Sequence, residues 1–196
     1  VRYNISQNDG IANSYGSITI GASAGNCNNN NIYNNTCYNN YVCADARAGN
    51  VNNNFYNNIF YCTASGTATV TAQTGAWFLN NDYYNSAGGF KFVIAGNTYT
   101  SLGALQASAW SEQWNGGNYG YNVNPTLNNP GNGGTIGNEY PNTLTNYKLN
   151  SGSPMINTGF NLATTTGFLF NVGSADFNGL SIPNGGAYDI GACEYH

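Results

Sequence analysis

The sequence predicts an all-β protein wound as a parallel β-helix, with about 23 residues in each coil. A motif with an asparagine pair between apolar or aromatic residues occupies residues 32–38, 55–61 and 78–84, so it recurs twice at a spacing of 23 residues. The leucine and alanine stripes of a helical repeat and the regular leucine ladder of a leucine-rich repeat are both absent. Because stacked coils lie roughly 4.8 Å apart, residues one period apart are expected to lie above one another.

The asparagine pairs are expected to form two columns at a bend between strands. One column holds Asn34, Asn57 and Asn80, and the other holds Asn35, Asn58 and Asn81. In such a column each side-chain amide donates to the carbonyl oxygen of the next, which satisfies polar groups without any charge. The apolar residues beside them, among them Ile32, Phe55 and Phe78, are expected to face inward.

The chain is expected to form a single domain, because 196 residues suffice for one substantial core. We expect regular coils over residues 1–97, a short helix and loops rich in glycine and asparagine over 98–146, and closing strands with a cap over 147–196. The first coil begins directly in a strand at Val1, so its edge is expected to be covered by preceding chain or by another subunit.

Two further strands and one helix are predicted from local patterns. Residues 18–20 and 67–71 alternate apolar or β-branched side chains with others, as half-buried strands do. Thr100 or Ser101 provides an N-cap for a helix that runs to about Ala107.

The composition excludes two broad classes of protein. Charged residues make up 6% of the chain, against roughly 25% in an average domain, and the net charge is −4. A nucleic-acid binder needs a basic face that this chain lacks. No apolar run approaches the roughly 20 residues of a membrane-spanning helix, so membrane insertion is not expected.

The five cysteines predict disulfides rather than a metal site. Four of them, Cys27, Cys37, Cys43 and Cys62, fall close together, which favours one or two local disulfides in an oxidising compartment; the fifth is Cys193. No Cys-x-x-Cys pair occurs and the one histidine is His196, so neither zinc nor another metal or cofactor is expected.

The weak candidates for catalysis are Asp45 and Arg47, which stand two residues apart and could form a small polar site. The alternative is a surface ion pair. The other basic residues, Arg2, Lys91 and Lys148, are scattered along the sequence, so they do not form a group that could abstract a proton from a uronic acid.

Glycoside hydrolysis would need two carboxylates roughly 5–10 Å apart. The column of Asp82 holds Ile59 and Thr36, and therefore no second acid. Asp176 and Asp189 are expected to accept hydrogen bonds from backbone amides in turns. We therefore do not expect the chain to carry an active site of its own.

Contact with carbohydrate is better supported by the residues. Four aromatic residues, Trp110, Trp114, Tyr119 and Tyr121, lie among Gln113, Asn115 and Asn118. Rings that stack on sugars beside amides that bind hydroxyl groups need no charge. The alternative is that the rings only fold this loop onto the wall of the solenoid.

Two sequons for glycosylation occur, at Asn4 and at Asn34. A glycan on Asn34 would disrupt the predicted column, so Asn4 is the candidate site.

Several segments together resemble the C-terminal portion of secreted right-handed parallel β-helix proteins. The closest resemblance is in residues 147–159, which include Ser153-Pro154-Met155-Ile156, and in residues 176–179 and 186–194; residues 1–10 and the helix followed by Asn124-Pro125 are also similar. The family usually has an acid where Asn157 stands and an aromatic residue where Cys193 stands. The resemblance implies right-handed coils and secretion, and the family includes polysaccharide lyases, glycosidases and surface adhesins, so the fold alone does not give the function.

We therefore expect an extracellular or cell-surface module that is structural or associated with glycans. Its expected partners are a neutral polysaccharide or glycan and other copies of itself, stacked end to end into a fibre or surface layer. Two alternatives remain open: the C-terminal part of a polysaccharide lyase or glycoside hydrolase, and a sugar-binding fragment of an adhesin.

Overall fold

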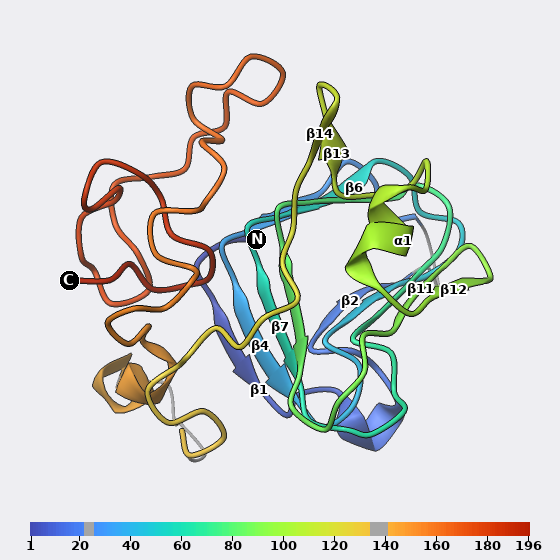
Figure 1. Ribbon diagram of the computed structural model, residues 1–196, viewed down its shortest axis with the longest axis horizontal. Helices are drawn as coiled ribbons and strands as arrows, with labels where there is room; N and C mark the ends of the chain where they lie inside the picture. The colour runs from blue at the N-terminus through green and yellow to red at the C-terminus, as the bar shows by residue number, and fades with distance from the viewer. Residues whose placement is uncertain (22–25, 134–140) are drawn as a thin grey trace.

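The computed structural model describes residues 1–21, 26–133 and 141–196. In the last of these ranges, side chains are described from Leu144 onward. Within them the chain forms a parallel β-solenoid of about three turns, with a repeat of about 23 residues (Figure 1). The predicted fold class is therefore confirmed at this level.

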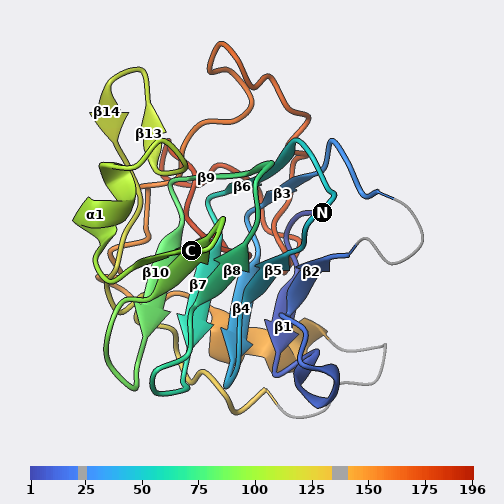
Figure 2. The ribbon, with the colours of Figure 1, turned by 90° about the vertical axis from the view of Figure 1, so that its right-hand side faces the viewer.

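Three parallel sheets form the walls, and Figure 2 shows strands of successive coils side by side. Sheet A contains β3 (Asn31–Tyr33), β6 (Asn53–Tyr56) and β9 (Ala76–Leu79). Sheet B contains β1 (Ile5–Gln7), β4 (Thr36–Asn39), β7 (Ile59–Cys62) and β10 (Asp82–Asn85). Sheet C contains β2 (Ile18–Ile20), β5 (Ala44–Ala46), β8 (Val70–Ala72), β11 (Phe92–Ile94) and the antiparallel β12 (Asn97–Tyr99).

The 23-residue period is strict in sheets A and B from the motif at residues 32–38 onward. Phe55 pairs with Ile32 on one side and Phe78 on the other, and its ring stacks on that of Phe78 at 4.6 Å between centroids. In sheet C the spacing changes, because Val70 pairs with both Ala44 and Phe92. The turn before β8 absorbs the extra residues, so this strand begins at Val70 rather than at the predicted residue 67.

The predicted helix is confirmed as α1 (Leu102–Gln106). The side chain of Ser101 caps it by accepting from the main-chain nitrogen of Ala104, and Leu105 is fully buried against the interior. Two short 3-10 helices, Ile11–Asn13 and Pro141–Tyr147, complete the helical structure of the described residues. None of the helices in this part of the chain has the length and apolar character needed to cross a membrane.

After α1 the chain forms one more, incomplete coil, which stacks on the coil of β9 and β10. Ser111 bridges to Phe78 and Tyr121 bridges to Asp82, both in parallel. Between these bridges the hairpin of β13 (Gln113–Trp114) and β14 (Gly117–Asn118) projects from the wall (Figure 1).

The remaining C-terminal segment covers two of the three walls. Leu162, Phe168 and Val172 pack on the outer side of sheet A, while Met155 and Ile190 pack on that of sheet B. Figure 1 shows this yellow-to-red segment beside β1, β4 and β7, away from β2, β11 and β12.

The closing strands predicted within residues 147–196 are not seen. Over the described residues 119–133 and 141–196 the chain makes isolated bridges, such as Gly159 with Tyr188, and turns. Side-chain carboxylates replace the missing ladders, as described below.

Candidate functional site

The first polar feature is a continuous amide column inside the bend between sheets A and B. Asn35 Nδ2 donates to Asn58 Oδ1 at 2.9 Å, and Asn58 Nδ2 donates to Asn81 Oδ1 at 2.8 Å. Each Oδ1 also accepts the main-chain N–H of the asparagine one coil earlier, at 3.0 Å. This predicted column is confirmed, and its three members are almost fully buried.

The column continues by one residue at each end. Asn4 Nδ2 donates to Asn35 Oδ1 at 2.9 Å, and Asn81 Nδ2 donates to Glu112 Oε1 at 3.1 Å. Glu112 is fully buried, and burial raises the pKa of its carboxyl group to about 7. Sequence reasoning missed Glu112, because it follows Asn81 by 31 residues instead of 23.

Asn4, the candidate glycosylation site, is exposed although its amide nitrogen donates to Asn35 and to the carbonyl oxygen of Arg2. The nitrogen that would carry a glycan therefore also belongs to the column. Its glycosylation stays a prediction.

The second predicted column has a different role. Its members Asn34, Asn57 and Asn80 have left-handed backbones with φ of 51°, 51° and 59°, a conformation that asparagine tolerates better than most residues. Asn80 donates to Asn57 Oδ1 at 2.9 Å, as predicted, but Asn34 donates to the carbonyl oxygen of Asp189 instead. The prediction of a continuous second column is therefore wrong at Asn34, because these amides turn outward to bind the C-terminal segment.

The predicted disulfides are absent, and all five cysteines are free thiols. Cys37 pairs in register with Ser6 and Phe60, and Cys62 pairs with Asn39 and Asn85, so neither has a cysteine above or below it. The prediction failed because closeness in sequence does not place two thiols in one column.

The thiols fill other roles. Cys62 occupies a column position between two asparagines, and its thiol donates to the carbonyl oxygen of Tyr41 at 3.2 Å. Cys193 accepts from Asn178 Nδ2 at 3.2 Å, and burial raises the pKa of this thiol to about 12.

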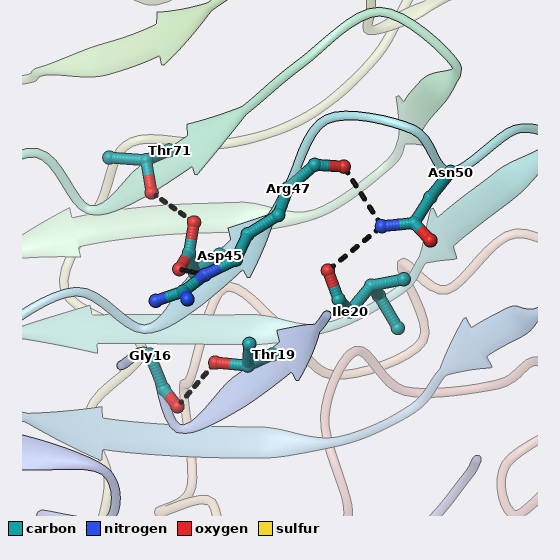
Figure 3. A network of polar contacts seen from close by, with 7 residues as sticks. All are labelled: Gly16, Thr19, Ile20, Asp45, Arg47, Asn50 and Thr71. Carbon is teal, nitrogen blue, oxygen red and sulfur yellow. Dashed lines mark hydrogen bonds and ion pairs between the residues drawn. The ribbon is translucent and has the colours of Figure 1, made fainter. Parts of the chain in front are cut away.

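Asp45 and Arg47 lie on the outer face of sheet C, where they form one small network (Figure 3). Asp45 accepts from Arg47 Nε at 2.8 Å and from Thr71 Oγ1 at 2.9 Å, so both carboxylate oxygens have partners. The Arg47 guanidinium lies 4.2 Å from the centroid of the Tyr15 ring. The contact between Asp45 and Arg47 is the one ion pair among the described residues. Its position on the outer face agrees with the simpler interpretation of the two residues, a surface ion pair.

The other basic candidates lie elsewhere. Arg2 donates to the carbonyl oxygen of Val172, and Lys91 donates to that of Gly66. Their charges therefore do not gather around Asp45.

The structure separates the four aromatic residues predicted to bind carbohydrate. Trp110 packs against the interior core, and Tyr121 packs with the residues that cover sheet B. Trp114 and Tyr119 join the cluster over sheet A, where Tyr119 lies 5.5 Å from Phe160 between ring centroids. Carbohydrate binding by the four stays a prediction, but only two of them share a surface.

The cluster over sheet A contains a second tryptophan that sequence reasoning did not select. Trp77 and Trp114 lie 5.8 Å apart between centroids, and both are partly exposed. Phe168 packs against both, at 4.9 Å from Trp114. Trp77 occupies the outward position of β9, directly before the third motif, so strand alternation was the signal that could have identified it.

Three buried carboxylates organise the C-terminal segment. Asp176 accepts the main-chain N–H groups of Asn178, Leu180 and Glu194. Asp189 accepts those of Asn157 and Tyr195, as predicted for an acid in a turn, and Glu194 accepts those of Asn184 and Asp189. Burial raises the pKa of Asp189, and it raises that of Glu194 to about 7. These acids replace strand ladders as the partners of main-chain N–H groups.

The resembled family has an acid at the position of Asn157. Here the side-chain amide has two carbonyl oxygens as neighbours, to which it can donate. With its nitrogen toward the carbonyl oxygens of Asn184 and Ala187, it donates to both, at 3.1 and 3.2 Å. An ionised acid could not donate at this position.

In the described part of the chain, histidine, cysteine and acidic residues form no group of three or more that could hold a metal ion. Compared with protein-family models and with curated proteins, the chain finds no match.

Proposed function

We propose that this chain is a module of an extracellular surface that is structural, associates with neutral glycans and carries no catalytic site of its own. We further propose that its coils are right-handed and that copies of it stack end to end into a fibre or surface layer. Right-handed connections between parallel strands are the strong norm, and the segments that resemble secreted β-helix proteins run through most of the chain.

The hydrogen bonding of the acids supports a structural role. Asp176, Asp189, Glu112 and Glu194 accept main-chain N–H groups, and Asp45 is paired with Arg47 and Thr71. Each of these acids is engaged with groups of the chain itself, which supports a structural role for it.

The observation that carries the glycan association is the pair formed by Trp77 and Trp114. The two partly exposed rings lie side by side over sheet A, and the exposed amides of Gln113, Asn115 and Asn118 lie on the hairpin that carries Trp114. Aromatic faces beside uncharged donors and acceptors suit a neutral sugar chain.

Affinity electrophoresis through gels that contain a neutral β-glucan or galactomannan tests the proposal. The native protein is expected to be retarded, and Trp77→Ala and Trp114→Ala are each expected to weaken binding at least tenfold. Tyr15→Ala serves as the matched control, because Tyr15 is 41% exposed on another wall. Retardation that survives both tryptophan substitutions would contradict the proposed surface, and so would the absence of retardation in every gel.

The alternative of a lyase or glycosidase can be tested on the same preparations. We expect no release of reducing ends or unsaturated uronates from neutral or acidic polysaccharides. Activity that disappears in Arg47→Ala or Asp45→Asn would show that the network on sheet C is catalytic and would overturn this part of the proposal.

A further inference from the structure

The outer face of sheet A carries two columns of side chains in different environments. The column that the C-terminal segment buries consists of Tyr33, Tyr56 and Leu79. The other column stands two residues earlier in each strand, and its members, which pair in register and stay partly exposed, are Asn31, Asn54 and Trp77. The second column therefore offers a line of accessible side chains that crosses the strands.

The asparagines of this exposed column belong to a grid of hydrogen-bonded amides. Asn54 Nδ2 donates to Asn31 Oδ1 and to Asn52 Oδ1, both at 3.2 Å. Asn52 Nδ2 donates in turn to Asn29 Oδ1 at 2.8 Å, and both Asn29 and Asn52 are exposed. Each side-chain amide offers two donors and two acceptor positions, which is more than the bonds of the grid occupy. The grid therefore holds amides in set orientations, and groups that are already oriented lose little freedom when a ligand binds.

The tryptophan pair continues the exposed column. Trp77 pairs with Asn54, and its ring lies 5.8 Å from that of Trp114 between centroids. Phe168 of the C-terminal segment supports the Trp77 ring, with the two rings 6.3 Å apart and within 8° of parallel. Figure 2 shows β3, β6 and β9 in this order, with the hairpin of β13 and β14 beyond β9. Because neighbouring strands are roughly 4.8 Å apart, the line extends along the axis of the solenoid.

The segments around this line carry no charge. No charged residue occurs between Asp9 and Asp45, between Arg47 and Asp82, or between Lys148 and Asp176. These three stretches supply all the strands of sheet A and the part of the C-terminal segment that covers it. A charged polymer would therefore find no opposite charge here, whereas the apolar faces and the hydroxyl groups of a neutral sugar chain would meet rings and amides.

We propose that Trp114, Trp77, Asn54 and Asn31 form one binding track for an extended, uncharged polysaccharide that runs across the strands. The inference rests on the proposed function, because it includes the tryptophan pair. It adds the form of the ligand: the track takes several consecutive sugar units of a long chain, not a single sugar. The tryptophans contact the units at one end of the track, and the amides of the grid bind hydroxyl groups of the units farther along.

The experiment follows the binding of neutral β-linked gluco- and manno-oligosaccharides, from disaccharide to hexasaccharide, by NMR titration. The affinity of the native protein is expected to rise with each added unit until the track is filled. The indole signals of Trp77 and Trp114 should shift with every oligosaccharide, whereas the side-chain amide signals of Asn54 and Asn31 should shift only with the longer ones.

Substitutions at the two ends of the track are expected to have different effects. Trp77→Ala should weaken the binding of every oligosaccharide. Asn54→Ala should leave the disaccharide unaffected and weaken the hexasaccharide about fivefold, as the loss of one hydrogen bond predicts. Asn31→Ala should have the same selective effect and provides a second, independent substitution in the grid. Asn97→Ala is the matched control, because it removes an exposed amide from β12 in sheet C, and it should bind every oligosaccharide as the native protein does.

Two results would overturn the track and leave the proposed function intact. One is an affinity of the native protein that no longer rises beyond the disaccharide, and the other is native affinity for the hexasaccharide in both Asn54→Ala and Asn31→Ala. In either case Trp77→Ala would still weaken binding, so the tryptophan pair alone would account for the contact with glycans. A native protein that binds none of the oligosaccharides, and no polysaccharide in the gels, would refute the proposed function and the track together.

Discussion

At the scale of single residues, the two asparagines of each motif perform different tasks. Asn57 takes a left-handed backbone at the bend and turns its amide outward, whereas Asn58 turns its amide into the column. Asparagine suits both, because its short side chain carries a donor and an acceptor and its backbone enters the left-handed region at low cost. A protein with 6% charged residues thus uses amides where others would place ion pairs.

Asn58→Ala is expected to destabilise the protein strongly. It removes the acceptor of the buried Asn35 main-chain N–H and one of the acceptors of Asn35 Nδ2, and it also deprives Asn81 Oδ1 of one of its donors. Each buried polar group left unpaired costs about 1–3 kcal/mol, so we expect a loss of about 3 kcal/mol or more in the free energy of unfolding, measured in urea. Asn54→Ala is the control: its amide donates to Asn31 and Asn52 from a partly exposed position, and a loss below about 1 kcal/mol is expected there. Equal losses for the two variants would contradict a special role of the buried column.

At the scale of elements, the solenoid wall and the C-terminal segment are joined by outward-facing asparagines. Asn57 donates to the carbonyl oxygen of Phe160 at 2.9 Å and accepts from its main-chain nitrogen at 2.8 Å. Asn80 donates to the carbonyl oxygen of Thr158, and Asn34 to that of Asp189. These contacts place an irregular segment on a regular wall.

Asn57→Gly is expected to loosen this attachment locally while the coils stay folded. Glycine keeps the left-handed backbone of residue 57 without strain but removes both bonds to Phe160. Hydrogen exchange at the Phe160 amide should therefore accelerate by at least tenfold, while that of Asn58 and Ile59 stays slow. Asn52→Gly is the matched control, because Asn52 also has a positive φ of 55° and its side chain bonds, among the described residues, only to those of Asn29 and Asn54. An unchanged exchange rate at Phe160 would show that apolar packing alone holds the segment.

Sequence reasoning succeeded for elements that repeat or that carry a clear capping signal, and it failed for most of the others. A fixed period specifies register, so the pairing of Ile32, Phe55 and Phe78 followed from spacing alone, and Ser101 marked the start of α1 through its capping chemistry. Glu112 could not be found in this way, because α1 and its flanking turns lie between it and the third motif and break the period. Of the two tryptophans, only Trp114 was predicted, because it lies in a loop rich in aromatic residues. Trp77 was not predicted, because it lies in a strand of the repeat.

At the scale of the whole molecule, acids are few but several are buried. Burial raises the pKa of Asp82 to about 8 and that of Glu112 to about 7, and it also raises the pKa values of Asp189 and Glu194. Asp82 is the extreme case: Oδ1 accepts the main-chain N–H of Val123, whereas Oδ2 is buried without a partner among the described residues. Between about pH 5 and the raised pKa values, these acids therefore keep their protons in the folded protein and lose them in the unfolded chain.

This proton retention predicts that stability falls as the pH rises, which is the reverse of ordinary acid denaturation. A folded pKa above the unfolded one means that the stabilisation is fully present below the unfolded pKa, at about pH 4, and is lost as the pH rises through the folded values near 7 and 8. Each pKa unit corresponds to about 1.4 kcal/mol.

The fully buried Asp82 and Glu112 together should therefore lower the melting temperature by several degrees between pH 5 and pH 9 in calorimetry. Asp82→Asn removes the largest contribution without adding charge, so its melting temperature should decline less over the same range and should exceed that of the native protein at pH 9. A native melting temperature that stays level or rises toward pH 9 would show that Asp82 and Glu112 are ionised in the fold at neutral pH, and the donors around Glu112 would then outweigh the cost of its burial.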